Sequence, residues 1–142
     1  MRTIIPAQSV DSFQLAWSYN DLIRHLSDSF YEVERKESVW IVSYSYYKFW
    51  ICLPELILYQ IGIYPNDEIF FMGIGFGDTL RDIEEKIGIW QEYYDLYILP
   101  TYQGIAFELA DNSMDEEWIE SEAPISAIYV FLPKKEDNES VL

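Results

Sequence analysis

The chain has 142 residues, half of them hydrophobic, which is enough for one folded domain that needs no metal or disulfide to be stable. It carries 25 acidic residues against 9 basic ones, for a formal net charge of −16. A field of that sign repels nucleic acids and anionic lipid surfaces, whereas it attracts basic proteins. Acidity that only maintains solubility is the alternative explanation.

The single cysteine indicates a reducing compartment. Cys52 lies in the apolar run Phe49–Leu53, which is typical of a buried core thiol, and it has no second cysteine with which to pair. The N-terminus lacks the apolar stretch of a signal peptide, and no run is long enough to cross a bilayer. We therefore expect a cytoplasmic protein with one domain over residues 1–133 and a polar, flexible tail over residues 134–142.

The N-terminal part predicts a strand followed by a short helix. Residues 9–16 have strand character around Phe13 and Leu15. Ser18 and Asp21 then have the spacing of a capping box, in which each side chain satisfies a free backbone N–H at the start of a helix. The apolar spacing that follows predicts that this helix ends near Ser27 or Asp28.

A charged segment and several strands are expected next. Residues 32–37 are charged and predict a loop. Residues 38–53 are rich in β-branched and aromatic side chains but too long for one strand, so we expect a turn near residues 46–48. Pro54 interrupts this region, and residues 56–64 predict another strand.

The middle of the chain predicts a hairpin and a second helix. Residues 65–67 have turn composition, and residues 68–74 would complete the hairpin as a strand. Leu80, Ile83 and Ile87 have helical spacing, and Gly88 lies where a left-handed C-cap would fall.

The last third predicts three more strands. Residues 93–99 and 105–109 should form a hairpin around the turn at 100–104. Residues 111–122 predict an acidic loop or short exposed helix, and residues 125–132 an internal strand covered on both faces. The expected fold class is α+β, with two short helices and a largely antiparallel sheet, a mixed sheet being the alternative.

A weak internal similarity links the two predicted helix starts. Residues 13–23 resemble residues 72–83, since each segment is strand-like and turns into a capped helix. The similarity indicates either two related halves or two ordinary strand-to-helix turns. We favour the second interpretation.

Sequence motifs for catalysis are weak. Gly73, Gly75 and Gly77 precede a helix, but their spacing is not that of a nucleotide-binding loop, and Asp78 stands where a phosphate would bind. His25 is the sole histidine and has no nucleophile motif beside it in the sequence. No pair of carboxylates can be singled out for glycoside hydrolysis. We expect no enzyme activity and no cofactor.

Metal sites are equally poorly supported. One histidine and one core-like cysteine do not make a zinc ligand set. The segment Asp111–Glu117 lacks the central glycine of a calcium-binding loop. We therefore expect no metal site.

Two acidic-aromatic clusters are candidates for partner binding, because rings can anchor an interface while carboxylates steer and pair with a cationic patch. A solvated charged surface is the alternative. The first cluster surrounds Trp118 and contains Asp111, Asp115, Glu116, Glu117, Glu120 and Glu122. The second cluster contains Glu92, Tyr93, Tyr94 and Asp95, together with Tyr97 and Tyr102. A third, mainly aromatic cluster contains Tyr44, Tyr46, Tyr47 and Lys48, although some of these rings must belong to the core.

The layout of the chain resembles the immunity proteins of bacterial contact-dependent growth inhibition and related polymorphic-toxin systems. The similarity lies in the segments Ile5–Pro6, Ser18–Ile23, Gly75–Ile83, Tyr102–Leu109 and Pro124–Val130. The resemblance implies a tight complex with one toxin domain, often a nuclease, and no catalytic residues.

Charge and resemblance lead to one expectation. Nucleases hold phosphate backbones on cationic surfaces, which suit an acidic inhibitor that is monomeric before it binds. We expect an immunity protein that blocks the active site or substrate surface of a basic nuclease, such as an RNase. The alternatives are another acidic inhibitor or adaptor module, or a small hydrolase or ligand-binding domain.

Overall fold

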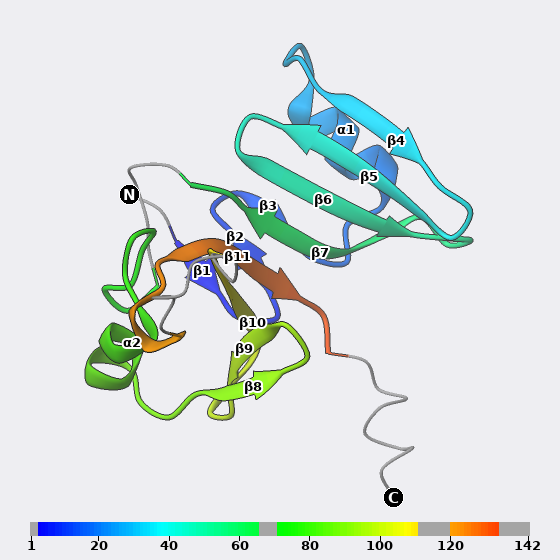
Figure 1. Ribbon diagram of the computed structural model, residues 1–142. Coiled ribbons are helices and arrows are strands. Elements are labelled where there is room, and N and C mark those ends of the chain that lie inside the picture. Colours follow the sequence, from blue (N-terminus) through cyan, green and yellow to red (C-terminus); the bar gives the residue numbers. More distant parts are fainter. Residues whose placement is uncertain (1–2, 66–70, 111–119, 134–142) are drawn as a thin grey trace, which may run out of the picture.

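The computed structural model describes residues 3–65, 71–110 and 120–133, and these form an α+β fold (Figure 1). The helices are α1 (Tyr19–Leu26) and α2 (Leu80–Lys86), with a 3-10 turn η1 (Glu120–Glu122). The strands are β1 (Ile4–Ile5), β2 (Ser9–Val10), β3 (Phe13–Gln14), β4 (Glu32–Arg35), β5 (Val39–Tyr44), β6 (Tyr47–Cys52), β7 (Ile57–Ile63), β8 (Gln91–Tyr93), β9 (Leu96–Leu99), β10 (Tyr102–Leu109) and β11 (Ile125–Phe131). All described strand pairs are antiparallel, so the expected fold class is confirmed.

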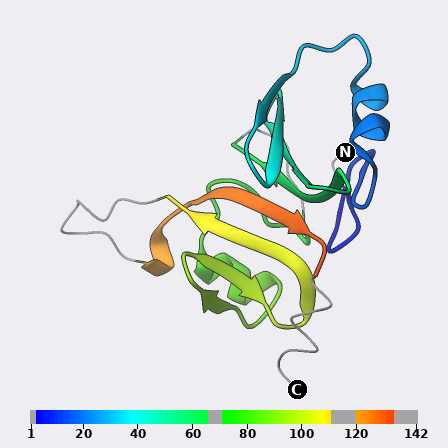
Figure 2. The same cartoon turned by 90° about the vertical axis from the view of Figure 1, so that its right-hand side faces the viewer.

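The two halves of the chain repeat the same order of elements. Helix α1 precedes four consecutive strands, β4 to β7, and helix α2 precedes β8 to β11. The eight strands lie in the order β4-β5-β6-β7-β11-β10-β9-β8, which places the last strand of each half at the centre (Figures 1 and 2). Two related halves would have this symmetric order, and our preference for two ordinary strand-to-helix turns stays a prediction.

One face of the eight-stranded sheet forms the core. Val42 pairs with Phe49, Phe49 with Ile61, Ile61 with Val130, and Val130 with Ile105, and all five side chains are fully buried. The buried residues of both helices and of the small β1–β3 sheet belong to the same cluster. In the described chain, the helices and the small sheet therefore cover this single face.

The opposite face, which we call the open face, alternates with the core residues along each strand. Ile41 pairs with Trp50, Trp50 with Gln60, and Gln60 with Phe131, and these four side chains are half-buried. No described helix packs on this face. The open face nevertheless presents aromatic rings, which are costly to leave in water and are typical of protein interfaces.

Both helices begin with a capping box, the motif that the sequence predicted for the first helix. Ser18 Oγ accepts from the backbone N–H of Asp21, and Thr79 Oγ1 accepts from that of Asp82. The hydrogen bonds from Thr79 to the Asp82 carboxylate lower the pKa of Asp82 below its usual range. Each box fixes the point at which the chain leaves the strand-like segment and enters the helix.

The Thr79→Ala variant should lower the free energy of unfolding by about 1 kcal/mol, because it leaves a helical N–H without its acceptor. The contribution of Asp82 should be complete above pH 5 and should fade as pH falls through its lowered pKa, below about pH 4. Urea unfolding at several pH values measures both effects. Thr101→Ala, at an exposed turn, is the matched control, and an equal loss in both variants would contradict the assignment.

Several predicted boundaries of the first half were wrong in detail. Residues 9–16 hold two short strands with a turn at Asp11, whose φ is +53°. The chain turns at Ser45 and Tyr46, slightly earlier than residues 46–48. Residues 32–37 contain strand β4 instead of a loop. This strand lies at the sheet edge, where charged side chains face water on both sides and hide the strand pattern.

The second half also differs from prediction. Residues 93–99 divide into the end of β8 and β9, because Tyr94 turns the chain with a φ of +57°. In the predicted strand 68–74, only residues 71–74 are described, and they form a bridged turn. Strand β11 is internal as predicted, but Tyr129 and Phe131 are only half-buried, so its second face is not fully covered. The predicted tail lies outside the described residues.

Candidate partner-binding surface

The structure describes some of the residues predicted to bind a partner. Asp111, Asp115, Glu116, Glu117 and Trp118 lie outside the described residues. Glu120 and Glu122 form the ends of η1, whereas Glu92, Tyr94 and Asp95 lie on the β8–β9 hairpin.

The β8–β9 hairpin and the loop before it expose apolar side chains to an unusual extent. Tyr94 is 81% exposed, Ile89 78% and Tyr93 55%. The rings of Tyr93 and Tyr94 contact each other edge to face, with centroids 4.7 Å apart. Large apolar side chains that remain in water beside carboxylates are what a preformed protein-binding surface presents.

Tyr97 joins the two acidic clusters, since it contacts Glu120, which lies 23 residues further along the sequence. Its ring is buried, and its hydroxyl donates a hydrogen bond of 2.6 Å to Glu120 Oε2. Burial and the carboxylates of Glu120, Glu92 and Asp95 raise the pKa of Tyr97 well above its usual range. The phenol therefore stays protonated and holds Glu120 beside the hairpin, so the carboxylates form one surface.

Sequence reasoning missed three further members of this surface, namely Glu84, Ile89 and Trp90. Trp90 Nε1 donates a hydrogen bond of 2.7 Å to Glu84 Oε1 on α2, and the Trp90 ring contacts Tyr97 edge to face. The sequence offered one signal for the Trp90 contact: Trp90 follows the predicted helix end near Gly88 closely enough to fold back against the last turn of that helix. We call the surface formed by Glu84, Ile89, Trp90, Glu92, Tyr93, Tyr94, Asp95 and Glu120 the acidic end.

Glu122 lies at the border of the acidic end and is partly neutralised. Its carboxylate is 3.7 Å from the guanidinium of Arg81 on α2, and both side chains are largely exposed. Such a pair contributes little to stability in water. We therefore leave Glu122 out of the acidic end.

The open face carries a layer of rings packed on a glycine. A Cβ at Gly62 would come within 2.9 Å of the Trp50 ring and 3.1 Å of the Tyr129 ring. The Tyr129 hydroxyl donates to Glu108 Oε1 at 2.7 Å and lies 3.4 Å from that of Tyr64. Burial, followed by these hydrogen bonds, raises the pKa of Tyr129. The layer is held in place by packing below and hydrogen bonds at its edge.

One pair of side chains resembles part of a hydrolase site. Ser12 Oγ and His25 Nε2 are 2.8 Å apart beside a hollow of about 310 Å³. The rings of Phe13 and Trp17 contact the imidazole. Among the described residues, no carboxylate hydrogen-bonds the other ring nitrogen, which a catalytic triad requires. The bond ties the β2–β3 turn to α1.

A fluorophosphonate probe should accordingly leave the protein unlabelled at Ser12, because an exposed hydroxyl without an oriented base is a weak nucleophile. Intact-mass measurement after incubation with the probe tests this expectation. Ser12→Ala is the control, and labelling that disappears in this variant would establish a nucleophilic serine.

The other motifs have structural explanations. The Gly75 N–H donates to Asp78 Oδ2 at 2.8 Å, so the glycine turn binds its own carboxylate where a phosphate would lie. Cys52 is half-buried on the open face instead of fully buried in the core. The described residues contain no group of histidine, cysteine or carboxylate side chains suited to a metal ion. Their helices are too short and polar to cross a membrane.

Comparisons of the chain with protein-family models, with curated proteins and with solved structures found no significant match. The functional argument therefore depends on the chemistry of the two surfaces alone.

Proposed function

We propose that the chain is an immunity protein that binds and neutralises a cognate toxin domain with a basic surface, a nuclease such as an RNase being the class that fits best. The observation that carries the proposal is the acidic end. There Tyr97 holds Glu120 against the hairpin of Glu92 and Asp95, beside the exposed rings of Tyr93 and Tyr94.

The chemistry of the acidic end suits a cationic protein better than a small substrate. Carboxylates on a rigid hairpin accelerate encounter with a basic domain and pair with its lysine and arginine side chains. The exposed rings supply the apolar anchors that usually carry most of the binding energy. The open face, whose rings lie beside the hairpin, would extend the contact area.

The proposal includes where and how the protein acts. A nuclease toxin acts on cytoplasmic nucleic acid, so the inhibitor would work in the cytoplasm as a monomer that binds one toxin domain. Its net charge of −16 would compete with the phosphate backbone for the toxin's cationic groove. Inhibition would need no cofactor and no metal.

Capture of the partner from the native cell tests the function. Proteins that bind to the immobilised chain at low salt would be eluted at raised salt. Each eluted protein would then be expressed in cells that lack the chain. We expect the captured partner to be a basic domain that arrests growth. We also expect growth to be restored when the chain is co-expressed in equimolar amount. A toxic partner whose activity persists in the presence of saturating chain would overturn the proposal.

A second candidate function uses the same surface. Another acidic inhibitor or adaptor would also present rings among carboxylates, and it would bind a basic regulator instead of a toxin. The partner's own activity separates the two candidates, because only a toxin arrests growth when expressed alone.

A further inference from the structure

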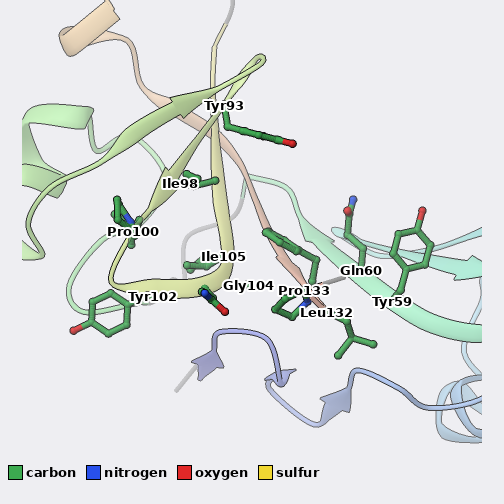
Figure 3. A pocket seen from close by; sticks show the side chains of 13 residues that line it. Tyr59, Gln60, Tyr93, Ile98, Pro100, Tyr102, Gly104, Ile105, Leu132 and Pro133 are labelled. Carbon is green, nitrogen blue, oxygen red and sulfur yellow. The ribbon is translucent and has the colours of Figure 1, made fainter. Parts of the chain in front are cut away.

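A hollow of about 520 Å³ lies on the open face, between the two halves of the sheet (Figure 3). Gln60 and Tyr59 of β7 line one side, and Ile98 of β9 lines the other. Tyr93 extends from the β8–β9 hairpin over the hollow toward β7 (Figure 3). The volume is typical of sites that enclose a small molecule or an inserted side chain.

The walls of the hollow combine rings with neutral hydrogen-bonding groups. Tyr59, Tyr93 and Phe131 contribute aromatic surface, and Gln60 and Gln103 contribute side-chain amides. None of the described lining residues carries a charge. Among these described residues an anion would find no cation to pair with, whereas the faces of the rings and the amide oxygens attract a positively charged group.

The surroundings add to this preference for a cation. Tyr93 belongs to the same hairpin as Glu92 and Asp95, although Glu92, which pairs with the buried Tyr97, lies on the opposite face of β8. The net charge of −16 favours a cation at a site whose described lining residues include no basic side chain. The hollow and the acidic end can therefore act on one partner.

Among biological cations, a guanidinium suits such walls best. It is planar and weakly hydrated, so it can stack on a ring and leave water at low cost. A lysine ammonium is a strongly hydrated point charge and loses more on entering a mostly neutral, ring-lined hollow. The five N–H donors of a guanidinium can also reach amide oxygens such as those of Gln60 and Gln103.

We infer that the hollow receives one arginine side chain of the basic partner, stacked against the rings of Tyr93, Tyr59 or Phe131. The inference rests on the proposed function, and it names the residue that would anchor the partner on the open face. A ring-lined pocket that excludes water is where a single side chain contributes most to an interface.

Peptide probes test the inference without the partner. The tripeptide acetyl-Gly-Arg-Gly-amide and the same peptide with citrulline or lysine are titrated into the ¹⁵N-labelled protein. Salt of roughly 0.3 M screens unspecific attraction at the surface. We expect the backbone amides of Gln60, Gly104 and Phe131 to shift with the arginine peptide, and its affinity to exceed those of the other two about fivefold or more. Equal shifts with the citrulline peptide would overturn the inference.

Two variants at exposed aromatic residues locate the effect. Tyr93→Leu removes an exposed ring that lines the hollow, and it should weaken binding of the arginine peptide several-fold. Phe30→Leu changes a highly exposed ring that lies outside the acidic end and is not among the lining residues, and it should leave the peptide affinity unchanged. Equal effects of the two substitutions would contradict an arginine site in the hollow.

The two proposals can fail separately. If the chain neutralises a toxin but does not distinguish arginine from citrulline, the arginine site is wrong and the immunity function stands. If the peptide binds selectively but the captured partner is not toxic, the site stands and the immunity function is wrong.

Discussion

The double variant Glu92→Lys/Asp95→Lys should associate with a basic partner about tenfold more slowly than the unchanged protein, because steering depends on carboxylates near the contact. Both side chains are exposed on the hairpin of the acidic end, so the fold should be preserved. Stopped-flow or surface-binding kinetics at low salt measure the association rate. The difference should shrink as added salt screens the charges.

A matched control separates local charge from total charge. Each reversal adds two charges, so two reversals change the net charge from −16 to −12 wherever they are made. Glu37→Lys/Glu55→Lys makes the same change at exposed positions in the other half of the sheet. An equal slowing of association in both double variants would show that only the total charge matters, and the acidic end would lose its special role.

The Gly62→Ala variant should lose about 1–3 kcal/mol of stability, which is typical of adding a methyl group where no space exists. The new Cβ would lie 2.9 Å from Trp50 Cζ3 and 3.1 Å from Tyr129 Cε1, so a ring must move. Urea unfolding measures the loss. The displaced rings should also weaken the binding of any partner to the open face.

The Trp50→Leu background shows whether the loss comes from the ring layer. In this background the most crowded neighbour of Gly62 is gone, so the cost of Gly62→Ala should fall by about half or more. An unchanged cost would mean that the alanine disturbs the backbone instead of the rings.

The helices could be predicted from sequence because their signals are local. A serine or threonine at the N-cap with an aspartate three residues later fixes each helix start, whatever lies around it. The internal position of β11 could also be predicted, because apolar residues occupy both of its faces, although the face of Tyr129 and Phe131 is only half-buried.

Edge strands and tertiary pairings gave no comparable signal. Strand β4 consists of Glu-Val-Glu-Arg and looks like a loop, since its charges are solvated at the edge of the sheet. The hydrogen bond from Tyr97 to Glu120 joins two elements that are 23 residues apart, so no spacing rule could predict it. The same holds for the pairing of β7 with β11, which creates the symmetric sheet and the open face.

Hydroxyl-radical footprinting of the complex tests the central claim most directly, because it reports the exposure of individual aromatic side chains. Tyr93 and Tyr94 should become protected when the partner binds, since they lie on the acidic end. Phe30, which is 82% exposed and lies just before β4 at the other end of the sheet, should react as in the free protein. Protection of Phe30 with unchanged Tyr93 and Tyr94 would contradict the account and move the interface to the opposite end of the sheet.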